Sequence, residues 1–134
     1  MTLSLQEAER VIDAALAKAR ALEVRVAVAV CDAGGHLLAF KRMDGTLWAS
    51  VYGCQGKAVA AAAFARPSGE LQERAEHPIV RGIIAAHGGN MIPSIGAVPI
   101  KRGGVAIGAC GVGGATGQQD EECARAGVEA LSGA

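Results

Sequence analysis

The last third of the chain constrains the fold most, because its glycines recur at the spacing of a β-hairpin followed by a helix. Apolar runs on either side of Gly103-Gly104 predict two strands, and a glycine loop at residues 111–114 leads into a helix expected over about 118–131. Strands joined by a two-residue glycine turn pair antiparallel. A loop with almost no side chains exposes backbone amides. We therefore expect residues 111–114 to help bind an anion or a polar ligand.

The remaining segments predict an α+β fold. Ser4 and Glu7 match a capping box that opens a helix over 5–22. Valines alternate along residues 24–31 and predict a strand with one strongly apolar face, which a turn at 32–35 joins to a second strand at 36–41. A helix is expected over 47–65, a short helical piece from residue 68, and a short helix with irregular loop over 77–95. Two hairpins with helices to cover them indicate a single α+β domain, residues 1–134, with an antiparallel sheet flanked by helices.

Composition narrows the class of partner. Thirteen basic and thirteen acidic residues cancel, and aromatic residues make up only 3% of the chain. Proteins that bind nucleic acids carry basic surfaces and aromatic stacking platforms, so nucleic acid is not expected. No apolar run reaches the ~18 residues of a membrane span, and no signal peptide is visible, so we expect no membrane partner and a cytoplasmic location.

The four cysteines are scattered and are expected to be buried, reduced thiols.

The glycine loop at 111–117 does not fit a nucleotide-binding motif. Thr116 stands where the dinucleotide fingerprint requires Gly or Ala, and a hairpin precedes the loop instead of the first strand of a βαβ unit. Thr116 and Gln119 instead match a second capping box.

Three histidines, His36, His77 and His87, are available, but none has the spacing of a metal or covalent haem motif. We therefore predict no metal site. His36 is best placed, at the mouth of the first hairpin, and His87 stands next to the flexible Gly88-Gly89 pair.

Lys57 interrupts a predicted helix whose other residues are mostly small and apolar. Such a lysine either extends its ammonium group into solvent or meets an anion, and the solvated arrangement is favoured. Asp120 and Glu121 fall in the first turn of the last helix, where the helix dipole alone favours them.

The chain resembles the GlcG/HbpS family along nearly its whole length. The resemblance is carried by residues 28–37, by Arg42-Met43-Asp44-Gly45, by Lys57-Ala58, by Gly111-Val112-Gly113-Gly114, and by Gln119-Asp120-Glu121 with Ala124 and Gly127. It implies a profilin-like α+β fold, homo-oligomers, and haem as a possible cofactor, because some family members bind or degrade haem. The chain departs from the family pattern at Ala97, where relatives have Gly, and at Gly113, where they have Ser.

Three functions follow as hypotheses. The first is a small-ligand or haem-binding protein, with His36, His77 or His87 as axial ligand; its candidate ligand-binding residues are His36, His87, Gly96, Ala97, Gly111, Gly113 and Gly114.

The second is a small catabolic enzyme, an isomerase, lyase or hydrolase acting on an organic acid. In that enzyme Lys57 or Arg42 would hold the carboxylate, the amides of 111–114 would stabilise an oxyanion, and Asp120, Glu121 or a histidine would move the proton. The third is an assembly unit whose Ala/Gly-rich helix, 47–65, forms an oligomer interface.

Overall fold

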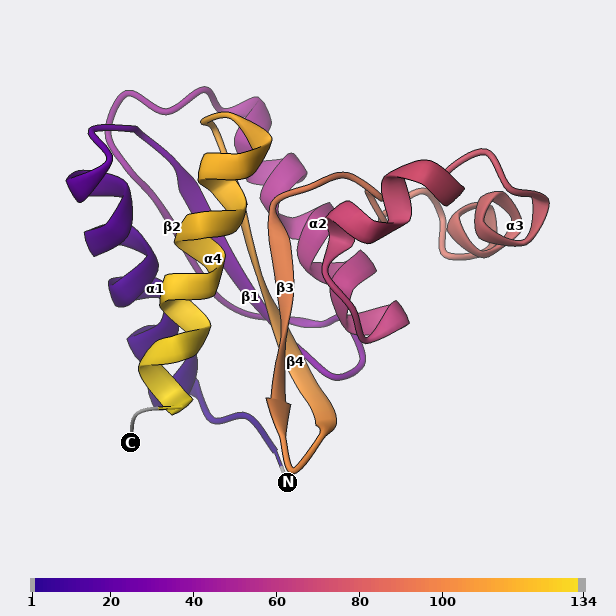
Figure 1. Ribbon diagram of the computed structural model, residues 1–134, viewed down its shortest axis with the longest axis horizontal. Coiled ribbons are helices and arrows are strands. Elements are labelled where there is room, and N and C mark those ends of the chain that lie inside the picture. Colours follow the sequence, from indigo (N-terminus) through magenta and orange to yellow (C-terminus); the bar gives the residue numbers. More distant parts are fainter. Residues whose placement is uncertain (1, 133–134) are drawn as a thin grey trace.

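The computed structural model describes residues 2–132 as one four-stranded sheet with helices on both faces (Figure 1). The elements follow in the order α1 (Leu5–Ala21), β1 (Ala27–Asp32), β2 (Leu37–Arg42), α2 (Ala49–Phe64), the 3₁₀ helix η1 (Ser68–Arg74), α3 (Pro78–Ala86), β3 (Ala97–Arg102), β4 (Val105–Gly113) and α4 (Gly117–Ser132). The strand order is β2-β1-β4-β3, and every neighbouring pair is antiparallel. The predicted α+β fold with an antiparallel sheet flanked by helices is confirmed.

Both predicted capping boxes are present and place the helices that frame the sheet. At α1 the Glu7 amide donates to Ser4 Oγ at 3.0 Å, and the Ser4 amide donates to Glu7 Oε1 at 3.1 Å. At α4 the Gln119 amide donates to Thr116 Oγ1, and the Thr116 amide donates to Gln119 Oε1, both at 3.2 Å. Each box satisfies amides that the first helical turn leaves without a partner.

The central strand β1 is buried on both faces, so the expectation of a single apolar face is wrong. Val28 and Val30 pack in the main core with residues of α1 and α4. Ala27, Ala29 and Cys31 face the other way, toward α2. Alternation of large and small apolar residues therefore marks two covered faces, and the small residues mark the face on which α2 lies close.

The helix α2 approaches the sheet closely because small residues meet there. Its buried residues include Cys54 and Ala58, and opposite them on β4 stands Gly111. A Cβ at Gly111 would overlap the backbone carbonyl of Cys54 and lie 2.8 Å from the Ala58 amide nitrogen. Gly53, by contrast, has nothing within 4 Å, and Gly56 packs against Ile92 of the loop after α3. Ala58, Ala60, Ala61 and Ala62 of α2 are buried and belong to this chain's own core.

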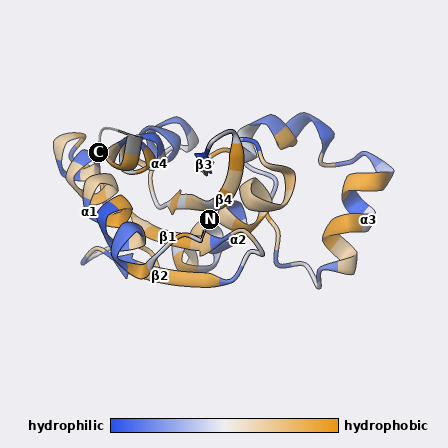
Figure 2. Cartoon of the chain, turned by 90° about the horizontal axis from the view of Figure 1, so that it is seen from below, coloured by the Kyte–Doolittle hydropathy of each residue, from blue (hydrophilic) through white to orange (hydrophobic). Residues whose placement is uncertain are grey.

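The helix α3 stands away from the body of the molecule, as Figure 1 shows, and Figure 2 shows its hydrophobic character. Val80 is its one buried residue, whereas Ile79 is 63% exposed. The short helix and the irregular loop expected over residues 77–95 are both confirmed. Within residues 2–132 no helix is both long and apolar enough to cross a membrane.

All four cysteines are free and buried, as the sequence predicts. Burial raises the pKa of Cys31 and of Cys54 to about 12 and that of Cys123 to about 11, and it also raises the pKa of Cys110. Raised pKa values keep these thiols protonated at neutral pH, so they act as small packing groups.

Candidate functional site

The first hairpin, α2 and the loop after α3 enclose a hollow of about 520 Å³, which we call the histidine hollow. Its lining combines two imidazoles with apolar and amide side chains: Gly34, Gly35, His36, Leu37, Tyr52, Gln55, Gly56, Val59, His87, Gly89, Asn90 and Ile92. The structure thus brings together His36 and His87, the two histidines predicted as ligand-binding residues. Its volume is typical of cavities that hold small molecules.

His36 is held by Asp32 at the start of the hairpin turn. One oxygen of the Asp32 carboxylate, Oδ1, accepts from the backbone amides of Gly34 and His36, both at 2.9 Å, and lies 3.2 Å from His36 Nδ1. These hydrogen bonds, the one from the His36 amide above all, lower the pKa of Asp32. The His36 side chain is 81% exposed, so the ring remains open to a ligand. The role of Asp32 was missed from the sequence; its signal is an aspartate that opens the turn four residues before a histidine.

His77 and His87 have different settings. His77 caps α3, and its Nδ1 accepts from the Ile79 amide at 3.4 Å. His87 lies at the other end of α3, where its carbonyl accepts from Asn90 Nδ2 at 3.2 Å. His77 is not among the residues that line the histidine hollow.

Lys57 and Asp120 form a buried ion pair that joins α2 to α4. Lys57 Nζ lies 3.1 Å from Asp120 Oδ2 and donates to the Val112 carbonyl at 3.1 Å. The two side chains are 12% and 3% exposed. Asp120 Oδ1 also accepts from the Ala115 amide at 3.0 Å. The favoured solvated arrangement of Lys57 is therefore wrong: the ammonium group meets an anion supplied by the chain itself.

The electrostatics of this pair balance two opposed effects. Burial raises the pKa of Asp120, and the Lys57 ammonium and the Ala115 amide oppose that rise. Gly96 makes the approach of Lys57 possible, because a Cβ there would lie 2.6 Å from Nζ and its φ of +143° suits glycine. The pair thus links α2 on one face of the sheet with α4 on the other, next to the end of β4.

The glycine-rich segments pack against backbone. Gly96 adjoins Lys57, Ala97 is fully buried, and a Cβ at Gly114 would lie 2.7 Å from the Arg25 carbonyl. The amides of Val112, Ala115 and Thr116 donate to Gly96, Asp120 and Gln119, so these donors serve the chain itself. Gly113 differs, because a Cβ there would meet its nearest atoms only at 3.4 Å. Ligand-binding roles for Gly96, Ala97, Gly111, Gly113 and Gly114 stay predictions.

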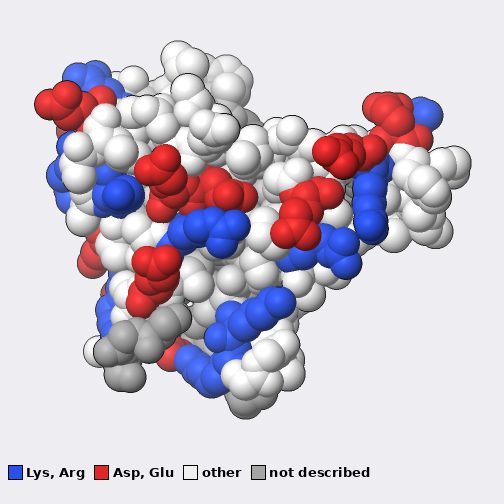
Figure 3. All heavy atoms as spheres, viewed as in Figure 1, with Lys and Arg blue, Asp and Glu red and all other residues white. Residues whose placement is uncertain are grey.

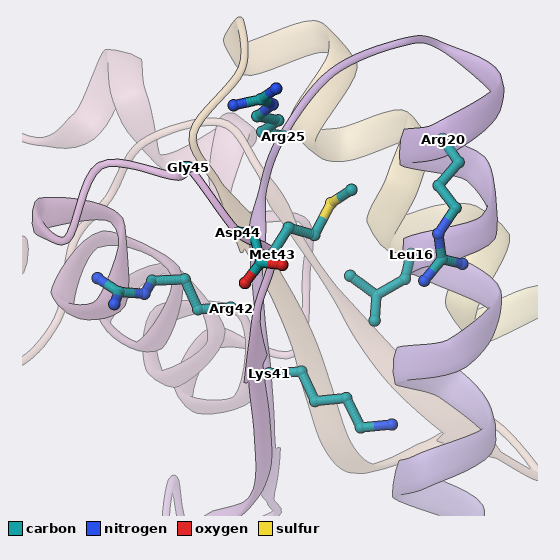
Figure 4. Close-up of a pocket in the computed structure, with 8 residues that line it drawn as sticks. All are labelled: Leu16, Arg20, Arg25, Lys41, Arg42, Met43, Asp44 and Gly45. Atoms are coloured by element: carbon teal, nitrogen blue, oxygen red, sulfur yellow. The ribbon is translucent and has the colours of Figure 1, made fainter.

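Arg42 lies in a second, basic hollow of about 560 Å³, the arginine hollow. Its lining residues are Leu16, Arg20, Arg25, Lys41, Arg42, Met43, Asp44 and Gly45 (Figure 4). In Figure 4 Lys41 extends toward α1, where it pairs with Asp13 at 2.9 Å, and Arg42 points away from that helix. Lys57, Asp120 and Glu121 do not line this hollow.

Glu121 pairs with Arg125, one turn further along the same helix α4, at 3.3 Å. The four residues predicted to carry catalysis therefore occupy three places: Lys57 with Asp120, Glu121 with Arg125, and Arg42 in the arginine hollow. On the face shown in Figure 3, acidic and basic side chains are interspersed.

Fold and site together define a small α+β domain with a histidine-lined surface hollow. Residues 3–129 match the family model described as haem degrading protein HbpS-like. GlcG from Escherichia coli is 37% identical over 111 residues, which cover 82% of this chain and 80% of GlcG. The chain therefore belongs to the HbpS-like family.

Solved structures agree with this assignment. The protein ORFY from Klebsiella pneumoniae has a TM-score of 0.92 at 27% identity, with 100% of this chain and 93% of ORFY covered. A PduOC:haem complex has a TM-score of 0.86 at 27% identity, with 97% of this chain and 95% of PduOC covered.

Proposed function

We propose that this chain is a ligand-binding protein and that haem, held in the histidine hollow, is its ligand. The observation that carries the proposal is the setting of His36. Its imidazole lines the hollow, is largely exposed, and has Nδ1 against the Asp32 carboxylate. An imidazole bound at Nδ1 in this way keeps Nε2 for a metal. Membership of a family named for haem degradation, and likeness to a PduOC:haem complex, support haem as the ligand.

The residues of the hollow suit haem. A haem site needs an axial donor and an apolar surface for the macrocycle. His36 would supply the donor, while Leu37, Val59 and Ile92 offer apolar contacts, and Tyr52 adds an aromatic ring. When bound, haem would supply iron that can accept a further ligand or change oxidation state. The chain's own part is to hold and orient the group.

Among the three candidate histidines, the contacts favour His36. Because His77 Nδ1 accepts a hydrogen bond, the neutral ring of His77 carries its proton on Nε2 and has no free lone pair there. His87 lines the hollow and is the natural second donor or a contact to the bound ligand. We therefore assign the axial role to His36.

An enzyme acting on an organic acid has weaker support. Its proposed carboxylate and proton-transfer groups stand in separate places, and Lys57 and Asp120 neutralise each other. A catalytic acid or base must reach the same substrate as the group that binds it. Binding is therefore proposed in preference to turnover.

The test is a haemin titration of the purified protein, followed by the Soret absorption. We expect saturable binding at one equivalent per chain, and His36→Ala to weaken it by about tenfold or more, because the axial donor is lost. His77→Ala is the matched control and should bind like the unaltered protein. Absence of a Soret shift in the unaltered protein, or equal affinities for His36→Ala and His77→Ala, would contradict the proposal.

We also propose self-association, which the family resemblance implies. Exposed apolar side chains support it: Ile79 on α3, Leu47 and Trp48 just before α2, and Tyr52 in its first turn. Apolar residues gathered on a surface are typical of interfaces. Light scattering should give a mass of two or more chains, and the mass of a single chain at micromolar concentration would contradict this proposal.

A further inference from the structure

The Asp32 carboxylate is the organising group of the first hairpin turn. Its Oδ1 atom accepts from two backbone amides, those of Gly34 and His36, and from the His36 ring at Nδ1. The backbone closes the same turn, since the Gly35 amide donates to the Asp32 carbonyl at 3.0 Å and the Asp32 amide donates to the His36 carbonyl at 2.9 Å. Asp32 and the His36 ring are thus fixed relative to each other by the turn.

An ionised carboxylate only accepts hydrogen bonds, so the contact requires a proton on Nδ1. The backbone amides of Gly34 and His36 both donate to Asp32 Oδ1 at 2.9 Å, an arrangement that suits the ionised carboxylate. A neutral imidazole carries one proton. With that proton on Nδ1, the Nε2 lone pair is free to bind a metal.

The turn also fixes the position of the ring. His36 lies over Gly34, where an added Cβ would come within 2.9 Å of His36 Cε1 and 3.0 Å of Nδ1. Any larger residue at position 34 would therefore push the ring away from the carboxylate. His77 provides the internal contrast, because its Nδ1 accepts a hydrogen bond from the Ile79 amide.

We propose that Asp32 is a positioning residue that sets His36, before any ligand arrives, in the Nδ1–H tautomer with Nε2 directed to a metal centre. The inference rests on the proposed function for the identity of the ligand, which is the iron of haem. The tautomer itself is a property of the ligand-free protein. Carboxylates that orient metal-binding histidines in this way commonly change metal affinity by about 10- to 100-fold when they are replaced.

The first experiment measures tautomers in the ligand-free, ¹⁵N-labelled protein by long-range ¹H–¹⁵N correlation at about pH 8.5, above the usual histidine pKa. We expect His36 to be mainly Nδ1–H and His77 mainly Nε2–H. Asp32→Asn keeps an oxygen that can accept from the turn amides but removes the charge, so it should shift the His36 ratio toward Nε2–H by about fivefold or more and leave His77 unchanged. Gly34→Ala should shift the His36 ratio in the same direction.

The second experiment titrates the same variants with haemin. We expect Asp32→Asn to bind about 10- to 100-fold more weakly than the unaltered protein. A His36 ring that is mainly Nε2–H in the unaltered protein, or a ratio unchanged in Asp32→Asn, would overturn the inference. If the tautomers behave as expected but the unaltered protein binds no haemin, the proposed function fails while the preset tautomer stands.

Discussion

Lys57→Met is expected to lower the free energy of unfolding by about 3–5 kcal/mol, because it leaves the Asp120 carboxylate buried without its partner. Methionine is unbranched and only one atom shorter than lysine, so the loss mainly reports the charge and its hydrogen bonds to Asp120 and to the Val112 carbonyl. Equilibrium unfolding in urea measures it.

Two further variants make this result specific to the buried pair. Lys57→Met with Asp120→Asn removes both charges but retains an oxygen that can accept from the Ala115 amide, so it should recover more than half of the loss. Lys41→Met breaks the exposed pair with Asp13 and should cost at most about 1 kcal/mol. If Lys57→Met costs no more than Lys41→Met, the pair is not the structural tie described above.

The defect of Lys57→Met should also depend on pH. Burial raises the pKa of Asp120, and the Lys57 ammonium opposes the rise, so loss of Lys57 raises that pKa further. A group whose pKa is raised in the folded state contributes stability at low pH that is lost as the pH rises through the folded-state pKa. Lys57→Met should therefore be closer in stability to the unaltered protein at about pH 5 than at about pH 8.

Gly111→Ala is the second substitution with a large expected effect, a loss of about 2–3 kcal/mol in the free energy of unfolding. The added Cβ would meet three groups of α2: the Cys54 carbonyl, the Ala58 amide nitrogen and, at 3.0 Å, the Ala58 Cβ. Backbone atoms cannot rotate away as a side chain does, so α2 would have to move off β4. Urea unfolding measures the loss.

Gly113→Ala is the matched control, two residues along the same strand and under the same helix. Its Cβ would meet the Cys54 amide nitrogen and the Ser50 carbonyl at 3.4 Å, which is ordinary contact. The change should be within about 1 kcal/mol of zero, since Gly→Ala also reduces the entropy of the unfolded chain. Equal losses at both positions would show that backbone contact with α2 is not what requires glycine at 111.

Local patterns predicted most of the fold. Alternating valines, the Gly103-Gly104 turn and two capping boxes are short-range signals, and the strands and helices they predict are present within a few residues of their expected ends. What they could not predict is which face of a strand a later helix covers. The second buried face of β1 depends on α2, whose approach depends in turn on Gly111, about 80 residues after β1 begins.

The candidate site could be predicted only in part, because local patterns do not show which distant segments come together. Local sequence points to His36 and to His87 separately, and their common hollow arises only because the loop after α3 lies beside α2 and the first hairpin. The Lys57–Asp120 pair spans 63 residues, so the helical pattern around Lys57 held no sign of its partner. The organic-acid hypothesis combines Arg42 with the amides of residues 111–114, but Arg42 lines the arginine hollow and those residues do not.

The central claim is that the histidine hollow is the ligand site, and nuclear magnetic resonance tests it most directly. Labelled protein is titrated with gallium(III) protoporphyrin IX, a diamagnetic analogue of haem, and amide shifts are followed along the chain. The account predicts the largest shifts in residues 34–37 and 87–92, which line the hollow or adjoin its lining. Largest shifts at residues 41–45, in the arginine hollow, or no shifts at all at stoichiometric ligand, would contradict it.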